Sequence, residues 1–479
     1  MPSTTSSGGL RVALIHPNVP HQDLFDRLAQ SHLPPLGVLY LASALRAEGH
    51  DVRVMDLNLD GAPEAMIPEL RRFRPDVVGM GSLAPSFEHV VNLSTRIRER
   101  LDHDYTFVAG GADASVRPEV YADTELFDTV LVGEAEQTLT ALCDALPQIP
   151  KMNGIVPPGE RTSPPAAVIR PDDMPFPARD LLPLKRYRGG PAYKIRRHTT
   201  SIFTHRGCAY TCTFCEKGVH DGPMRFRSAR SMFEEVREIV EKYGIRDIRF
   251  IDDVLMINRK ILTEFCDLVI ENGLRFDWLC CSRMDLMHPE LLAKMRRAGC
   301  YRLELGVESG NDRILEMTKK GARTRQAIEA MTAARQAGIE VIANYIVGFP
   351  SETVDEMRET IDFSLRLKSD FAIYFAFVPY QGATIADQYH LGWGPLANGF
   401  RDKSRHYLVD TETVQGMVDR AYTRFYFRPD FIARRLTTAR SAWLIADLAR
   451  LAGLYTARKA RRAFSRAQAA FAAVTRPTI

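Results

Sequence analysis

The sequence predicts an α/β protein in which a doubly wound, Rossmann-like domain precedes a partial (β/α)6 barrel and a helical C-terminal region. Three observations carry this prediction. Short apolar runs alternate with longer amphipathic segments in two separate series, a pattern typical of parallel sheets covered by helices. A proline-rich stretch separates the two series. Three closely spaced cysteines follow the first apolar run of the second series.

The composition is that of a globular protein of several domains. The 479 residues are 45% hydrophobic and carry a formal net charge of +4, enough for two or three domains with their own cores. No run of about 18 apolar residues occurs, so no membrane-spanning helix is expected. The polar segment 1–10 lacks the features of a secretory leader, so we expect a disordered tail on a cytoplasmic protein. The expected boundaries are 11–150 for the first domain, 151–197 for a linker, 198–395 for the barrel and 396–479 for the tail.

The first series predicts an open parallel sheet. Its expected strands are 12–15, 52–55, 77–80, 106–108 and 129–132, with a helix over 36–47 that stops at Gly49. Ligands of such sheets bind beyond the carboxyl ends of the strands. Small residues gather there, in 79–82, 110–112 and 133–136. On spacing alone a nucleotide would fit as well as another ligand, but no G-x-G-x-x-G follows the first strand.

The linker and the second series follow. Prolines at 157–158 and 164–165 break regular structure, and 171–182 is predicted to be a proline-stiffened connector. The barrel strands are expected at 202–204, 248–251, 278–281, 301–306, 341–347 and 371–376, with helices over 232–243, capped by Ser231, and 260–272. Catalytic groups of β/α barrels sit at the carboxyl ends of the strands. The polar candidates there are Asp252, Asp253, Arg283, Glu308, Ser309, Gly348, Pro350 and Glu352.

The cysteine loop has the spacing C-x3-C-x2-C, formed by Cys208, Cys212 and Cys215, with Phe214 before the last. Structural zinc sites take four ligands, and an iron–sulfur cubane takes one ligand on each iron. Three cysteines therefore leave one iron of a cubane open for chemistry. A Cys3His zinc site using His205 or His220 is the alternative, and a disulfide is disfavoured. The other cysteines, Cys143, Cys266, Cys280, Cys281 and Cys300, are expected in the core.

This loop resembles the cluster-binding loop of radical S-adenosylmethionine (SAM) enzymes. The resemblance implies that Cys208, Cys212 and Cys215 hold a [4Fe-4S] cluster whose free iron chelates SAM, which the reduced cluster splits into methionine and a 5′-deoxyadenosyl radical. Segments 306–310 and 346–353 resemble the family's SAM-contacting segment and its turn near adenine. The implied SAM contacts are Phe214, Asp253, Arg283, Glu308, Ser309, Gly348 and Pro350. The alternatives are that Asp252, Asp253 and Glu352 cap helices and that Arg283 pairs with Asp285 on the surface.

The first domain resembles the cobalamin-binding domains fused to radical SAM enzymes. The matching segments are 34–42, 110–115 and 132–136, and 171–182 is similar to the strap between the two domains. The resemblance implies cobalamin contacts at Leu36, Ser82, Gly110, Gly111, Asp113, Gly133 and Glu134. Asp113 stands where the family often has His, and Ala112 replaces Pro. The D-x-H-x-x-G motif is missing, so cobalamin would bind without a histidine on its lower face. A domain that kept its fold and lost its ligand is the alternative.

The combined resemblance implies an enzyme that methylates an unactivated carbon or phosphorus centre. The 5′-deoxyadenosyl radical would abstract a hydrogen from the substrate, which would then take the methyl group of methylcobalamin. The alternatives are a cobalamin-dependent cyclisation, ring contraction or rearrangement, and a non-catalytic protein whose cluster serves structure or sensing. The expected substrate is a small molecule, a secondary metabolite or a lipid. The expected electron donor is external, such as flavodoxin or ferredoxin.

The tail is basic and helical. Its charges include Arg434, Arg435, Arg440, Arg458, Lys459, Arg461 and Arg462, and Leu444, Leu448, Leu451 and Tyr455 share one helical face. The tail either docks on the barrel or lies on an anionic membrane. Nucleic acid is not expected as a partner, because the positive charge is confined to the tail. Tyr374, Tyr380 and Gln381 either line a substrate pocket or pack the barrel.

Overall fold

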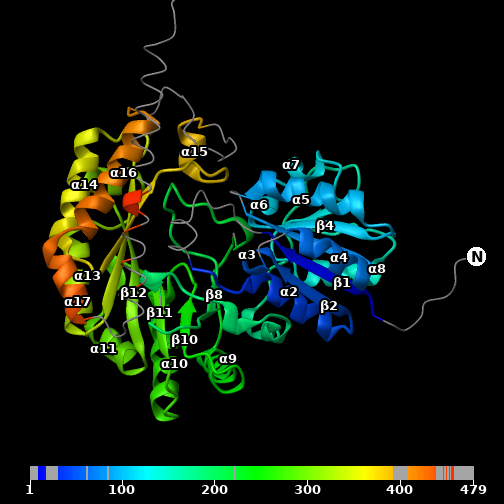
Figure 1. Cartoon of the computed structure of the whole chain (residues 1–479), viewed down its shortest axis with the longest axis horizontal. Helices are drawn as coiled ribbons and strands as arrows, with labels where there is room; N and C mark the ends of the chain where they lie inside the picture. The colour runs from blue at the N-terminus through cyan, green and yellow to red at the C-terminus, as the bar shows by residue number, and fades with distance from the viewer. Residues whose placement is uncertain are drawn as a thin grey trace, which may run out of the picture.

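The chain forms two α/β parts that lie side by side, coloured blue to cyan and green to yellow in Figure 1. The structure is a computed structural model that describes residues 9–17, 31–60, 63–83, 86–193, 195–220, 222–391 and 408–438, with six positions between 446 and 457. Residues 1–8 of the predicted tail 1–10 lie outside the described residues, as does the barrel end at 392–395. The same holds for the basic residues Arg440, Arg458, Lys459, Arg461 and Arg462 and for Leu444, Leu448 and Leu451.

The N-terminal part is built on a six-stranded sheet of order β2-β1-β3-β4-β5-β6. Its strands are β1 (Arg11–His16), β2 (Asp51–Asp56), β3 (Val77–Ser82), β4 (Thr106–Gly111), β5 (Thr129–Leu131) and β6 (Ile155–Val156). All neighbouring pairs are parallel except β5 with β6. The predicted doubly wound sheet is therefore confirmed. The sheet also extends into the expected linker through β6. This strand was not predicted, because its two residues are too few to show a strand pattern in the sequence.

Helices cover both faces of this sheet. They are α2 (Leu36–Ala47), α3 (Leu57–Asp60), α4 (Pro63–Phe73), α5 (Phe87–Arg100), α6 (Ala112–Val116), α7 (Pro118–Ala122) and α8 (Glu136–Ala145). Apolar clusters lie on each side, one around Phe107 and Ile97 and the other around Leu45 and Leu142. Strands buried on both faces explain the nearly continuous apolar runs of the sequence. The helix expected over 36–47 forms with those bounds.

The second part contains a six-stranded, all-parallel sheet of order β14-β13-β12-β11-β10-β7. Its strands are β7 (Thr200–Ile202), β10 (Asp247–Phe250), β11 (Asp277–Arg283), β12 (Cys300–Glu308), β13 (Glu340–Val347) and β14 (Phe371–Ala376). Sequential parallel pairing of six strands is the expected partial barrel. A two-stranded hairpin, β8 (His205–Arg206) with β9 (Arg225–Phe226), was not predicted and frames the cysteine loop.

The barrel helices are α9 (Ala229–Lys242), α10 (Arg259–Glu271), α11 (Pro289–Arg297), α12 (Asp312–Met317), α13 (Thr324–Gln336), α14 (Val354–Leu367) and α15 (Thr384–Gln388). The cap predicted at Ser231 is wrong, because Ser228 accepts the Ser231 N–H at 3.2 Å and caps α9. Asn258 caps α10 and Thr353 caps α14. The alternative roles of Asp252, Asp253 and Glu352 as helix caps are therefore wrong.

Two tail helices, α16 (Thr411–Tyr426) and α17 (Pro429–Thr438), lie against the barrel beside α14 (Figure 1). The buried face of α16 joins the barrel core through Val414, Met417, Val418, Ala421 and Phe425. Two tyrosine hydroxyls also bind the unpaired edge of β14. Tyr426 Oη accepts the Ala372 N–H at 3.1 Å, and Tyr422 Oη accepts the Tyr374 N–H at 3.2 Å. The docking alternative is confirmed for these two helices, which cover an otherwise open sheet edge.

Among the helices that the structure describes, none is long and apolar enough to cross a membrane.

Candidate active site

The three loop cysteines lie between the β8–β9 hairpin and the open end of the barrel. Cys208 and Cys212 are half-buried and Cys215 is exposed. The Cys215 N–H donates to the Cys212 carbonyl at 3.2 Å, which closes a tight turn around Thr213 and Phe214. Thr213 is anchored on both sides, since its N–H donates to the Thr318 carbonyl at 2.9 Å and its carbonyl accepts the Ile385 N–H at 2.8 Å. The loop is thus held rigidly, with its thiols left accessible.

Asp252 connects this loop to the sheet. Its carboxylate follows β10 and accepts the backbone N–H groups of Thr204 at 2.5 Å and His205 at 2.9 Å. Burial raises the pKa of Asp252, while these hydrogen bonds and the nearby His205 act in the opposite direction. Asp252 therefore fixes the start of the loop against the neighbouring strand, and the next residue, Asp253, lies at the mouth of the cavity described below.

The thiols are close enough to influence one another. Partial desolvation by the surrounding loops, the Asp253 carboxylate and the two other thiols raise the pKa of Cys215 to about 12. A bound metal centre supplies the positive charge that makes such thiols ionise. No group of three His, Cys, Asp or Glu side chains among the described residues converges on a single metal-ion position. His205 instead faces Asp252 and His220 faces Glu134, so neither histidine completes the alternative zinc site.

Arg283, at the end of β11, reaches the cysteine loop. Its guanidinium donates to Asp285 at 2.9 Å, stacks at 3.6 Å over the Tyr210 ring, and has Nη1 3.7 Å from Cys212 Sγ. The pair with Asp285 that we considered does form, but Arg283 is buried and not on the surface. This positive charge beside a cluster cysteine suits the carboxylate of a ligand bound at the cluster.

Glu308, at the end of β12, forms an ion pair that the sequence did not predict. Lys320 Nζ lies 2.7 Å from Glu308 Oε1, and both side chains are buried. Glu308 also adopts a left-handed backbone conformation, with φ of 67°, which is uncommon for residues other than glycine. Such a strained position at a strand end is typical of ligand-binding sites. Lys320 lies 12 residues after Glu308, in no motif, so no pattern pointed to it.

The other expected SAM contacts have different surroundings. Ser309 is buried and its hydroxyl lies 3.0 Å from Thr360 Oγ1, so its side chain holds the loop, and a SAM contact at this residue stays a prediction. The Glu352 carboxylate accepts the N–H groups of Gly348 and Phe349 and so shapes the turn that contains Pro350. Phe214 packs on Phe349 with ring centroids 5.7 Å apart. The cysteine loop and the turn after β13 are therefore neighbours, as the resemblance implies.

A cavity of about 410 Å³ lies between the two parts of the chain. Its N-terminal side is formed by the carboxyl ends of β1, β3 and β4 and by the start of α2, and its barrel side by residues 203, 205–207, 219–220 and 251–253. The lining includes Leu36, Ser82, Gly110, Gly111, Gly133 and Glu134, six of the seven residues predicted to contact cobalamin. Gly111 has φ of 102°, and a Cβ there would lie 2.7 Å from the Ser82 carbonyl oxygen, so only glycine fits.

Asp113, the seventh predicted cobalamin contact, does not line the cavity. Its carboxylate accepts hydrogen bonds from Arg117 Nε at 2.9 Å and from Tyr121 Oη at 2.6 Å, and all three side chains are buried. The prediction of a cofactor contact through this side chain is therefore wrong. The residue sits on the first turn of α6, where a basic residue four positions later satisfies it within the domain.

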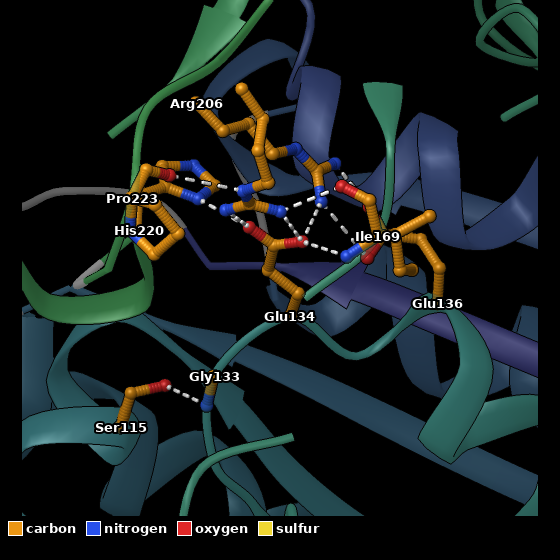
Figure 2. Close-up of polar contacts among 9 residues, drawn as sticks. Ser115, Gly133, Glu134, Glu136, Ile169, Arg206, His220 and Pro223 are labelled. Atoms are coloured by element: carbon orange, nitrogen blue, oxygen red, sulfur yellow. Dashed lines mark hydrogen bonds and ion pairs between the residues drawn. The ribbon is translucent and has the colours of Figure 1, made fainter. Parts of the chain in front are cut away.

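Glu134 lines the cavity, but its carboxylate is occupied by the barrel. It receives Arg206 Nη1 at 2.8 Å and Arg225 Nη1 at 2.9 Å, and lies 3.2 Å from His220 Nδ1. Although burial acts to raise it, the hydrogen bonds from Arg225 and His220 and the charge of Arg206 hold the pKa of Glu134 well below its ordinary value. Figure 2 shows Arg206 between Glu134 and Glu136.

The same turn is braced from within its own domain. Ser115 Oγ accepts the Gly133 N–H at 2.9 Å, below the ion-pair cluster in Figure 2. Arg206 and Arg225 were missed by the sequence analysis, because nothing in a single sequence pairs them with a glutamate of the other domain. Their positions in the β8–β9 hairpin mean that the cysteine loop and the glycine-rich cavity wall share one rigid boundary.

The donor sets suit two different groups. Three thiols, with Arg283 beside one of them, fit an iron–sulfur cluster that has an open iron. A glycine-lined, mostly apolar cavity at the strand ends fits a flat macrocycle. Two known protein families that bind such groups match the chain. The family model of the radical SAM superfamily matches residues 202–364, and that of the B12-binding domain matches residues 27–143.

The chain is a radical SAM enzyme with an N-terminal B12-binding domain. An uncharacterized methyltransferase of Pyrococcus horikoshii is 29% identical over 89% of this chain and 94% of its own. The hopanoid C-3 methylase of Methylococcus capsulatus is 30% identical over 70% of this chain and 64% of its own. The anaerobic magnesium-protoporphyrin IX monomethyl ester cyclase of Rubrivivax gelatinosus is 28% identical over 78% and 68%.

Solved structures share the fold of this radical SAM enzyme. The cobalamin-dependent SAM radical enzyme OxsB, with aqua-cobalamin and SAM bound, superposes with a TM-score of 0.71 at 17% identity over 94% of this chain and 71% of its own. The radical SAM methyltransferase TsrM from Kitasatospora setae, with cobalamin and a [4Fe-4S] cluster bound, gives 0.63 at 20% identity over 79% and 75%. At these identities the likeness concerns the fold.

Most of the cysteines outside the loop lie in the core. Cys143, Cys266, Cys280 and Cys300 are buried as predicted. Cys281 is only half-buried and has Sγ 3.4 Å from Glu304 Oε2. Tyr374 is buried against Tyr345 and its hydroxyl lies 2.6 Å from Ser364 Oγ, so the packing alternative is confirmed for it.

Proposed function

We propose that the protein is a cobalamin-dependent radical SAM methyltransferase. The observation that carries the proposal is that the ligand-binding edges of both parallel sheets open on one cavity. Gly110 and Gly111, at the end of β4, line it from one side, and Asp253, which lies near Cys215, lines it from the other. A group held by the N-terminal domain would therefore sit next to a group held by the cysteine loop.

The residues of the barrel divide the work of holding the cofactors. Cys208, Cys212 and Cys215 hold the [4Fe-4S] cluster, Arg283 binds the SAM carboxylate, and Glu308, held in place by its ion pair with Lys320, binds its amine or ribose. Phe214 and the turn of Gly348 and Pro350 form the adenine side. When bound, these cofactors supply a 5′-deoxyadenosyl radical and the methyl group of methylcobalamin, and the protein positions the substrate and excludes water.

Methyl transfer is favoured over rearrangement by the names of the relatives. The relative that covers most of both chains is named a methyltransferase, and others are a hopanoid C-3 methylase and a cytidylyl-2-hydroxyethylphosphonate methyltransferase. The anaerobic cyclases are the specific ground for the second candidate, a ring-forming reaction without methyl transfer. Formation of S-adenosylhomocysteine together with 5′-deoxyadenosine would support the first candidate, and 5′-deoxyadenosine alone the second.

The substrate is proposed to be a small molecule with an apolar part. Ile251, just past β10, and Phe375, on β14, are 40% and 49% exposed, so part of their apolar surface is open to a ligand. Phe375 points to the face of β14 opposite Tyr374, whose ring packs toward α14 and α16. An apolar substrate would cover these two side chains, which suits a lipid or a hydrophobic metabolite.

The electron donor and the location of the protein are also proposals. Radical SAM chemistry needs an external one-electron donor such as flavodoxin or ferredoxin, and a cytoplasmic location stays a prediction. A membrane contact through Arg428 and Arg434 is disfavoured, because both side chains donate to backbone carbonyls of the barrel. Arg434 Nη2 donates to the Ser369 carbonyl at 3.0 Å, and Arg428 Nη1 to the Leu365 carbonyl at 3.2 Å.

The proposed function is tested with anaerobically reconstituted protein, SAM and a reductant. The expected result is a bound cluster, cleavage of SAM and retention of added cobalamin. Protein that binds iron and sulfide but never cleaves SAM would support the non-catalytic alternative.

A further inference from the structure

His16 ends β1, the strand at which the order of the N-terminal sheet reverses, because β2 flanks it on one side and β3 on the other. In doubly wound sheets the ligand sits at this reversal, beyond the carboxyl ends of the strands. His16 lines the cavity there, next to 79–83 and 109–112, which follow β3 and β4. The neighbouring strand ends are mostly glycine, so His16 is the nitrogen base that this side of the cavity offers within the described residues.

The imidazole of His16 is also uncommitted. Among the described residues, three histidines line the cavity, and two of them have partners: His205 faces Asp252 and Thr204, and His220 faces Glu134. Within the part of the chain that the structure describes, the His16 ring forms no hydrogen bond. Burial lowers its pKa, with the Asp56 carboxylate acting in the opposite direction. A neutral ring is the form of histidine that binds metals.

The Asp56 carboxylate lies beside His16 on the neighbouring strand. Asp56 is the register partner of His16 across the β1–β2 pair, so both side chains lie on the same face of the sheet. Asp56 is fully buried and is held by the Tyr187 hydroxyl at 2.7 Å and the Asn58 N–H at 3.1 Å. The Asp56 carboxylate acts on His16 through its charge, not through a hydrogen bond, and that charge raises the basicity of the ring.

We propose that His16 is an axial ligand of the cobalt of cobalamin bound in this cavity. The inference rests on the proposed function, because it needs bound cobalamin. It replaces the expectation, drawn from the missing D-x-H-x-x-G motif, that the lower face would meet no histidine. Asp113, which occupies the place of a family histidine, cannot take this role because its carboxylate is held by Arg117 and Tyr121.

The test is the electron paramagnetic resonance spectrum of cob(II)alamin on the full-length protein. The unpaired electron of Co(II) points along the axial direction, so an axial nitrogen splits each cobalt line into a triplet. Protein labelled with 15N-histidine should convert that triplet into a doublet, which the nucleotide base of cobalamin itself could not do. This readout needs neither turnover nor a variant that folds.

Variants then assign the histidine. His16→Ala should retain cobalamin but lose the nitrogen splitting, whereas His220→Ala, a change in the same cavity, should keep it. Bound cobalamin without nitrogen splitting, a triplet insensitive to 15N-histidine, or splitting that survives in His16→Ala would each overturn the inference and leave the proposed function standing. Protein that retains no cobalamin at all would overturn both.

Discussion

Arg206 Nη1 lies 2.8 Å from Glu134 Oε2, across the boundary between the B12-binding domain and the radical SAM barrel. Arg206 precedes Cys208 by two residues, and Glu134 belongs to the turn that follows β5. Both side chains are buried, and Glu136 binds the same guanidinium. The position of the cysteine loop relative to the cobalamin cavity therefore depends on a buried charge cluster that would be costly to break.

Replacing Arg206 by methionine should destabilise the protein by about 3–5 kcal/mol, because two buried carboxylates lose a cation. The measurement is the free energy of unfolding by urea. Arg46→Met is the matched control, since Arg46 also reaches a residue distant in sequence, Asp180, but both side chains are nearly half exposed. The control should cost about 0–1 kcal/mol. Equal losses in the two variants would contradict the account.

The charge on Glu134 should give the cluster a pH dependence. Because the folded-state pKa is lowered, its stabilising effect is fully present above the ordinary value of 4.5 and is lost as the pH falls toward the folded-state pKa. The stability advantage of the natural protein over Glu134→Gln should therefore shrink steadily in acid. Urea unfolding at several pH values below neutrality measures it. A stability advantage that stays constant below pH 4.5 would show that these partners do not lower the pKa of Glu134.

Cys212→Ala should abolish both the cluster and SAM cleavage while leaving cobalamin bound, because the cavity is formed by other residues. Iron and sulfide content and 5′-deoxyadenosine formation measure this. Cys143→Ala is the control, since Cys143 is buried in α8 and belongs to no ligand set. SAM cleavage that survives in Cys212→Ala would contradict the cluster assignment.

Arg283→Lys should weaken SAM binding at least tenfold with little effect on cluster content. Lysine keeps the charge but cannot donate to Asp285 and lie beside Cys212 at the same time. Equilibrium binding of SAM to the reconstituted enzyme is the measurement. An unchanged affinity for SAM would mean that Arg283 does not bind SAM and that its role is the ion pair with Asp285.

The double variant Tyr422→Phe/Tyr426→Phe should lose about 1–3 kcal/mol of stability for each hydroxyl, because backbone groups of β14 would lose their partners. Urea unfolding compares it with each single variant. A double variant as stable as the natural protein would mean that the edge of β14 does not need the tail.

The sheets and the cysteine loop could be predicted from the sequence because their signals are local. Apolar runs fix each strand within a few residues, and α2 forms with the predicted bounds. Contacts between distant residues could not be predicted. Nothing local marks Lys320 as the partner of Glu308, or Arg206 and Arg225 as partners of Glu134.

The errors have the same origin. Asp113 stands at a motif position, but its carboxylate binds Arg117, a contact that only the fold reveals. No motif marks His16, because its distinguishing feature is its place at the end of β1 beside the cavity. Helix caps were misplaced by a few residues because several serine, aspartate and asparagine side chains compete at each helix start.

We propose that one cavity brings a methyl donor on cobalt to a radical made at the cysteine loop. The most direct test uses anaerobically reconstituted protein mixed with hydroxocobalamin and freed of unbound cofactor. Its corrin absorption spectrum is recorded before and after addition of reductant and SAM. The account predicts retained cobalamin that becomes methylcobalamin. Protein that retains no cobalamin would contradict it and would leave a B12-binding domain that has kept its fold and lost its ligand.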